Sequence, residues 1–295
     1  MTKYYKVAGH IFSLSIPDSC TLPPRLSQYD PFEVEPDGSE PLFSVELVKD
    51  AYEPVPGAEV VYDVPTEEGE TVIKLYHHKD GWDFDMSPDK SIPFRSHMRS
   101  SEDFSKGVLM LDTRKVSDAV FGINNSLMLL YAFRTAPLDT LEMHASMVSN
   151  SGKAFLFLAK SGTGKSTHSS LWLEHIPGTE LMNDDNPVVR VWPDGSVIAY
   201  GSPWSGKTPC YHNIQAPVGA FVRIRRCPEN KIAPLGMLES YALLYSSCSG
   251  FKADKTIADG LHSTLERIVT TKPCYVLDCR PDDEAARVCA AELLK

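Results

Sequence analysis

The sequence contains no long apolar run. No apolar stretch approaches the roughly 20 residues that a helix needs to cross a bilayer, so we expect no part that spans or binds a membrane. The first residues also lack the positively charged and then apolar pattern of a secretory signal, so secretion is not expected. Both absences favour a cytoplasmic protein.

Positive charge is also scarce. The chain has 29 Lys and Arg against 39 Asp and Glu, which gives a net charge of −10. Such a chain lacks the broad positive field of a nucleic-acid-binding protein, and we expect no nucleic-acid partner. A local basic pocket for a small anion is still compatible with this composition.

Cysteine pairs at disulfide or metal-binding spacing are absent as well. The seven cysteines are scattered, their number is odd, and no CxxC occurs. We therefore expect neither a disulfide scaffold nor a closed zinc site. Reduced and mostly buried cysteines are the simpler interpretation.

The length of 295 residues and the apolar fraction of 42% predict about two domains with packed cores. Residues 1–115 are rich in proline and acidic residues, and the segments 11–16 and 71–76 alternate with period two. We expect a small β-rich N-terminal domain there and assign no chemistry to it. Apolar residues at helical spacing predict a helix that links the domains at 116–137.

From about residue 138 the pattern alternates between strands and helices. A wholly apolar run at 154–158 predicts a strand buried on both faces. We expect helices at 165–175, at 256–269 and after 282, and strands at 180–183, 187–191, 197–200, 218–224 and 274–278. This alternation predicts an α/β layered core over residues 138–295.

A glycine-rich motif follows the apolar run and opens the next helix. Its sequence is Ala159-Lys-Ser-Gly-Thr-Gly-Lys-Ser-Thr167. A strand, a glycine-rich turn and a helix are the context of a phosphate-binding P-loop, although Ala159 stands where glycine is usual. The backbone amides and the helix N-terminus would surround the phosphates. We assign nucleotide binding to Ser161, Gly162, Thr163, Gly164, Lys165, Ser166 and Thr167.

Within this motif the side chains have separate roles. Lys165 would reach the β- and γ-phosphate oxygens, and the Ser166 hydroxyl would bind Mg²⁺. Asp184 and Asp185 follow a predicted strand and supply the acidic partner that such a metal needs. One carboxylate could hold Mg²⁺ and the other could take the proton from an attacking hydroxyl.

Two classes of P-loop protein lack support. The string that would recognise guanine in a GTPase is Asn-Lys-x-Asp, and the nearest match, at 230–233, lacks the aspartate. The Leu-Ser-Gly-Gly-Gln element of an ABC-type ATPase is also missing. A single P-loop in a chain of this length leaves a kinase or a nucleotide-gated switch.

The motif and the paired aspartates resemble the HPr kinase/phosphorylase and phosphoenolpyruvate carboxykinase superfamily. The resemblance covers roughly residues 138–295 and extends upstream of the loop, through 141–148 and 152–158. It implies a mixed sheet with helices, in which phosphoryl transfer uses an aspartate base, a P-loop lysine and Mg²⁺. The expected fold class is thus an α/β P-loop kinase core preceded by a small β-rich domain.

The resemblance also suggests individual roles. His144 matches a family histidine that lies beside the catalytic aspartate, although a buried structural histidine would fit the sequence equally well. The family pattern favours Asp184 as the metal ligand and Asp185 as the base, but the order of the two stays open. No Leu-Glu-x-Arg-Gly-Leu-Gly stretch occurs, so the phosphorylase activity and HPr as the acceptor are not expected. The chain is also too short for a complete carboxykinase.

The loop 201–208 and a basic cluster are further candidates. We interpret the segment around Lys207 as a substrate-side loop whose lysine neutralises charge on the transferring group, with an exposed structural lysine as the alternative. Trp204 could cover the site or pack against an acceptor. Arg223, Arg225 and Arg226 suit phosphate contact, but a solvated strand end is the favoured interpretation.

The sequence therefore predicts an ATP-dependent, Mg²⁺-requiring kinase whose acceptor is a hydroxyl of a peptide, a protein or a small molecule. GTP is not excluded as the donor, and the resemblance is compatible with a homo-oligomer. The alternative hypothesis is a nucleotide-gated binding module or regulatory P-loop protein without phosphotransfer.

Overall fold

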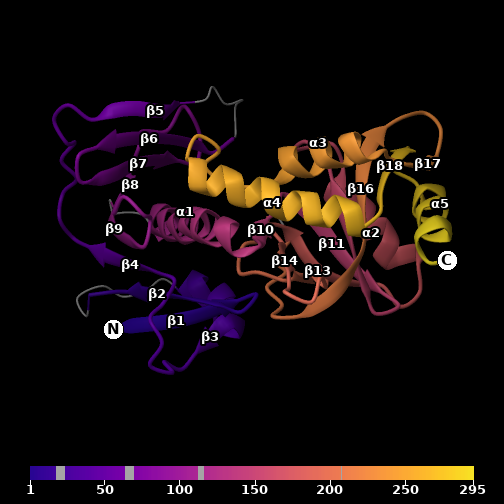
Figure 1. Cartoon of the computed structure of the whole chain (residues 1–295), viewed down its shortest axis with the longest axis horizontal. Helices are drawn as coiled ribbons and strands as arrows, with labels where there is room; N and C mark the ends of the chain where they lie inside the picture. The colour runs from indigo at the N-terminus through magenta and orange to yellow at the C-terminus, as the bar shows by residue number, and fades with distance from the viewer. Residues whose placement is uncertain (18–23, 64–69, 112–115, 207) are drawn as a thin grey trace. The chain divides into compact units, whose positions relative to one another are not determined.

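The computed structural model describes residues 1–17, 24–63, 70–111, 116–206 and 208–295 (Figure 1). The chain is mixed α/β and divides into two compact units, Met1–Arg134 and Thr135–Lys295. The helix predicted as a linker is α1 (Val116–Thr135), which belongs to the first unit except for its last residue. The division of the chain therefore falls at the end of this helix.

The first unit is built on a mixed sheet in the order β3-β1-β2-β4-β9-β8-β7-β6-β5. Its strands are β1 (Thr2–Val7), β2 (His10–Ser15), β3 (Glu33–Val34), β4 (Phe43–Val48), β5 (Glu59–Asp63), β6 (Val72–His78), β7 (Gly81–Ser87), β8 (Ser96–Ser100) and β9 (Lys106–Leu111), and a 3-10 segment covers Pro24–Phe32. The strands predicted at 11–16 and 71–76 are confirmed as β2 and β6. The remaining strands were not predicted.

Helix α1 packs on this sheet through one apolar face. Ile123, Leu127 and Tyr131 are buried, and the Tyr131 hydroxyl donates to the carbonyl oxygen of Val7 at 3.1 Å. A Cβ on Gly122 would lie 2.4 Å from the Leu111 side chain, so a larger residue would require this side chain to shift. The helix is thus an integral layer of the first unit.

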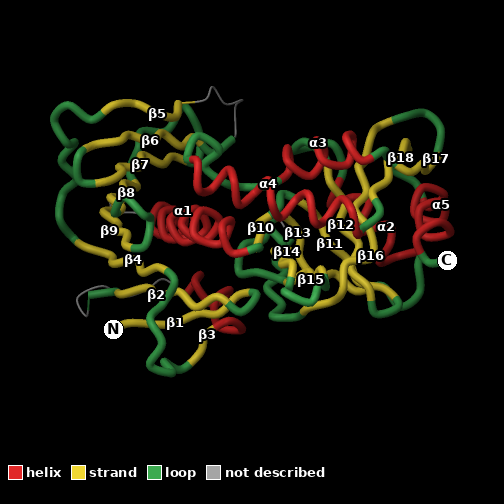
Figure 2. The backbone as a smooth tube through the Cα atoms, in the orientation of Figure 1, coloured by secondary structure: helices red, strands yellow, loops and turns green. Residues whose placement is uncertain are grey.

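The second unit contains the predicted alternation of strands and helices (Figure 2). Its strands run in the order β10-β14-β15-β16-β12-β11-β13, with β18 pairing β16 and β17. They are β10 (Thr140–Glu142), β11 (Ala145–Asn150), β12 (Lys153–Leu158), β13 (Glu180–Asp185), β14 (Val188–Val191), β15 (Val197–Tyr200), β16 (Gln215–Arg226), β17 (Lys231–Pro234) and β18 (Cys274–Cys279). The helices are α2 (Lys165–His175), α3 (Met237–Ser247), α4 (Lys255–Thr271) and α5 (Asp283–Leu293), after a 3-10 turn at Ala136–Leu138.

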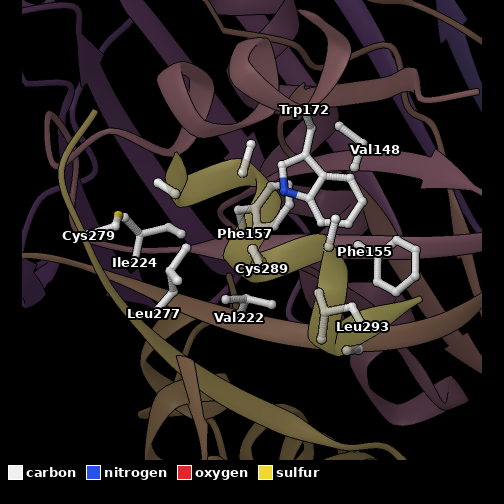
Figure 3. Close-up of a cluster of buried hydrophobic side chains, with 14 residues drawn as sticks. Val148, Phe155, Phe157, Trp172, Val222, Ile224, Leu277, Cys279, Cys289 and Leu293 are labelled. Atoms are coloured by element: carbon white, nitrogen blue, oxygen red, sulfur yellow. The ribbon is translucent and has the colours of Figure 1, made fainter. Parts of the chain in front are cut away.

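One core lies between the strands and the helices α2 and α5. Trp172 of α2 is fully buried, and its ring lies 5.4 Å from that of Phe155 and 5.6 Å from that of Phe157 (Figure 3). Cys289 and Leu293 of α5 join the same cluster. This packing holds α2, and hence the loop that precedes it, against β12.

The described cysteines are unpaired, and five of these six are buried. In the part of the chain that the structure describes, no helix combines the length and apolarity that crossing a membrane requires.

Candidate active site

The glycine-rich loop, residues 159–166, connects the end of β12 to the first turn of α2. Gly162 and Gly164 have φ angles of +72° and +126°, and a Cβ on either would meet nothing within 4 Å. Glycine is therefore favoured here by backbone conformation and not by space. The first amides of a helix have no intrahelical acceptor, so those at the start of α2 are available to an anion.

Strand register brings two further segments to this loop. Ala145 at the start of β11 lies opposite Leu158 at the end of β12, and also opposite Asp185 at the end of β13. His144, the residue before β11, therefore meets the loop and the aspartate pair at one sheet edge. Its backbone amide is fixed by the carbonyl oxygen of Ser247, at 2.7 Å.

Lys165, His144 and Asp185 form a direct chain of polar contacts. The Lys165 Nζ lies 2.7 Å from His144 Nε2, and His144 Nδ1 lies 3.2 Å from Asp185 Oδ1. An ammonium group only donates, so Nε2 is the acceptor and a neutral imidazole carries its proton on Nδ1, facing the carboxylate. The structure thus brings together three residues that the sequence predicted for the site.

Lys165 is almost fully buried and also donates to the carbonyl oxygen of Ala159 at 3.1 Å. Burial lowers the pKa of Lys165, and the charges of Asp185 and Asp184 oppose that shift. A desolvated amine with few fixed partners is well suited to bind an incoming phosphate. An anionic ligand bound at the loop would therefore offset the burial of this charge.

Backbone contacts hold the aspartate pair in place. The amide of Gly206 donates to the Asp184 carbonyl oxygen at 2.7 Å, and Asp185 forms an isolated antiparallel bridge with Ser205. A Cβ on Gly206 would lie 3.1 Å from the Asp184 carbonyl oxygen and 3.2 Å from Asp185 Cβ. A side chain at residue 206 would therefore require the loop or the aspartates to shift by a few tenths of an ångström. Asp184 is 4% exposed, and the Asp185 side chain is 35% exposed.

A buried amide network, which the sequence analysis missed, supports the same turn. The Asn183 Nδ2 atom donates to the carbonyl oxygen of Trp204 and to the hydroxyl of Ser202, each at 3.2 Å. The Asn183 Oδ1 atom accepts from the amide of Asn186 at 2.9 Å. An asparagine directly before two aspartates was the only sequence signal for this network.

The structure corrects two expectations about the neighbouring loop and the basic cluster. Trp204 is 3% exposed, so it belongs to the core and does not cover an acceptor. Arg226 is not simply a solvated strand end: its Nε donates to the carbonyl oxygen of Thr163 at 3.0 Å, and its Nη2 donates to that of Gly162 at 2.5 Å. Arg225 instead pairs with Asp278 of β18. The prediction for Lys207 lies outside the described residues.

Glu142, which the sequence analysis also missed, is fully buried close to this site. Its Oε1 atom lies 3.4 Å from the Ser249 hydroxyl, and its Oε2 atom has no hydrogen-bond partner among the described residues. Burial raises the pKa of Glu142 well above its ordinary value, the Ser249 hydrogen bond opposes this, and the charge of Asp185 adds to it. Burial thus favours the protonated form of this carboxyl group in the folded protein.

Glu142→Gln should stabilise the protein at alkaline pH. The unfolded chain releases this proton near pH 4.5, whereas the folded chain retains it to much higher pH. The stabilisation is thus complete below pH 4.5 and is lost as the pH rises through the folded-state pKa. We expect the free energy of unfolding, from urea titrations at pH 8, to rise by about 1–3 kcal/mol in E142Q. The exposed Glu174→Gln is the control, and a pH dependence unchanged in E142Q would contradict the assignment.

The oxygen groups present suit Mg²⁺. Among the described residues, no cluster of three or more His, Cys, Asp or Glu side chains could hold a metal by itself. Mg²⁺ commonly takes only one or two protein oxygens and completes its shell with water and substrate phosphates. The exposed Ser166 hydroxyl at the start of α2 and the Asp184 carboxylate are ligands of this kind.

Comparisons with known proteins do not assign this chain to a family. No model of a known protein family matches the chain, and no curated protein matches it either. Among solved structures, the Hpr(Ser) kinase/phosphatase from Coxiella burnetii is similar over 52% of this chain and 96% of its own, with 10% sequence identity and a TM-score of 0.32. This likeness is weak.

Proposed function

We propose that the protein is an ATP-dependent, Mg²⁺-requiring kinase that transfers the γ-phosphoryl group to a hydroxyl of a peptide, a protein or a small molecule. The observation that supports this most strongly is the contact chain from Lys165 through His144 to Asp185. It joins a cation beside a P-loop to a half-exposed carboxylate. A protein that only binds nucleotide needs the first group but not the second.

The P-loop amides and Lys165 would bind the triphosphate and stabilise the charge that develops as the bond between the γ-phosphorus and the bridging oxygen breaks. The acceptor hydroxyl oxygen forms the new bond to phosphorus, its proton passes to the Asp185 carboxylate, and ADP leaves. His144 Nδ1 lies 3.2 Å from Asp185 Oδ1 and so helps to orient the carboxylate. Mg²⁺ held by Ser166 and Asp184 would offset the negative charge of the phosphates.

The first test supplies γ-labelled ATP and Mg²⁺ to the purified protein with separate pools of free amino acids, serine-terminated peptides, and sugars and polyols. We expect label in one pool and none in a parallel reaction with Lys165→Ala. Nucleotide binding without label in these pools or in added proteins would contradict the kinase and favour the nucleotide-gated binding module.

A further inference from the structure

A cavity of about 680 Å³ lies beside the glycine-rich loop, within the second unit. It is bounded by Thr163, Gly164 and Thr167 on one side and by the ends of β16 and β18 on the other. Pockets of 300–1,000 Å³ typically hold small-molecule ligands, so a nucleoside fits this size. The cavity thus begins where the proposed phosphate site ends.

The lining changes from polar to apolar along the cavity. The end nearest the loop offers backbone groups and the Thr167 hydroxyl, whereas Leu171, Ile224, Pro228 and Pro281 form much of the remaining wall. A ligand that matches this lining has a polar end at the loop and a flat apolar body away from it. A nucleotide has this distribution.

The two arginines of the lining already have partners within the protein, so they do not indicate an anion-binding site in addition to the proposed phosphate site. Arg280 donates to Asp282 at 2.7 Å, to Glu284 at 2.8 Å and to the Pro228 carbonyl oxygen at 3.2 Å. Arg226 holds the carbonyl oxygens of the glycine-rich loop, as described above. Their charge is therefore largely engaged within the protein, which favours an uncharged ligand group in this part of the cavity.

His168 contributes its ring to the lining. Its Nε2 accepts from the Trp172 indole nitrogen, which can only donate, at 3.1 Å. The neutral ring then carries its proton on Nδ1, and this buried atom has no hydrogen-bond partner among the described residues. Burial lowers the pKa of His168 to about 4, so this ring adds no charge to the lining.

We propose that this cavity binds the nucleoside half, base and ribose, of the nucleoside triphosphate whose phosphates bind to the glycine-rich loop; the inference rests on the proposed function. The residues described as its lining include no carboxylate or amide side chain to recognise the edge of a base. The base is therefore held mainly by its faces. ATP and GTP should bind with Kd values within about tenfold of each other, a difference of about 1.4 kcal/mol.

Cys227 offers a direct probe because it lines the cavity and is half-buried. Burial raises the pKa of the other described thiols, to about 11 for Cys210, Cys274 and Cys279 and to about 12 for Cys248, and in the same direction for Cys289. Iodoacetamide should therefore alkylate Cys227 first. We would use the full chain with Cys20→Ser, so that residue 20, which lies outside the described segments, cannot react.

Saturating ATP should slow alkylation of Cys227 at least tenfold, and GTP should do the same. Inorganic tripolyphosphate, which has no nucleoside, should slow it less than twofold although it binds. Protection by ATP but not by tripolyphosphate would support the inference. Binding of ATP by calorimetry without protection of Cys227 would overturn it and leave the phosphate site intact. If neither ATP nor tripolyphosphate binds, the proposed function fails as well.

A matched pair of substitutions on α2 provides the second test. Leu171→Glu places a carboxylate in the cavity wall, whereas Leu173→Glu adds the same charge at a residue that is 41% exposed and outside the lining. We expect L171E to raise the Kd for ATP at least tenfold and to change that for tripolyphosphate less than threefold. L173E should change neither. Equal ATP binding in both folded variants would overturn the inference, and if L171E does not fold, the alkylation rates decide.

Discussion

Asp185→Asn should lower the turnover of phosphoryl transfer by about 10²- to 10⁴-fold, the usual contribution of a general base. The amide retains an oxygen that can accept from His144 Nδ1, so the local geometry should persist. What is lost is the ability to take the proton of the acceptor hydroxyl. The Kd for ATP should therefore stay within about threefold, because base catalysis contributes to the transition state and not to nucleotide binding.

Asp184→Asn is the natural comparison, since the neighbouring carboxylate is assigned to the metal. This variant should need a higher Mg²⁺ concentration for half-maximal activity, whereas Asp185→Asn should not. The measurements are steady-state transfer to the acceptor, Mg²⁺ titrations and calorimetric ATP binding. Equal losses of turnover and affinity in Asp185→Asn would assign this residue to binding, and exchanged phenotypes would reverse the two roles.

Lys165→Ala should reduce transfer by about 10²- to 10³-fold or more while the protein stays folded. The substitution removes the only charge that the described geometry places between the loop and His144. It also removes a charged group whose burial is unfavourable, so the melting temperature should not fall by more than a few degrees. Thermal melts and the labelling assay measure these effects side by side.

Lys160→Ala is the matched control because Lys160 belongs to the same loop but is exposed. We expect its activity to stay within about threefold of the unsubstituted protein. Full activity in Lys165→Ala would refute the assignment of the loop as a P-loop. Equal losses in both variants would indicate that the charge of the loop acts through general attraction of ATP and not through a specific contact.

The part of the fold that the sequence predicted best is the segment from β12 to β13. Apolar runs, glycines and a lysine at the right spacing gave the helix at 165–175 with its observed bounds. Strand β11 was missed because polar residues such as Ser146 and Asn150 are buried in it. Its strand conformation follows from its pairing with both β12 and β13, which its composition does not indicate.

The first unit was harder to predict for a related reason. Strands β7 and β8 carry charged residues that compensate one another across the sheet, as where Arg99 donates to Asp83 at 2.8 Å and His97 lies 2.6 Å from Asp85. From the sequence alone, a buried aspartate such as Asp83 suggests a loop, because its partner in the sheet is not known. Such pairing depends on register, which single-sequence periodicity does not reveal.

In the candidate site, too, local sequence motifs could be recognised, whereas contacts between distant segments could not. Lys165, Asp184 and Asp185 were predicted because a strong local motif fixes their context, and His144 because a family resemblance pointed to it. Glu142 was not considered, since it lies in no motif, and Arg226 was considered for phosphate contact with a solvated strand end as the favoured interpretation. Each gains its role only from a contact made by a segment distant in the chain.

The hydrogen bonds from Arg226 to the glycine-rich loop limit where this chain can accept insertions and deletions. Residues 215–226 form one strand, and its last side chains alternate: Arg225 faces Asp278 while Arg226 faces the loop. Deleting or inserting a single residue within β16 would exchange these two directions and release the loop. Insertions within the strand should therefore not be tolerated, even though most of its residues carry no chemistry.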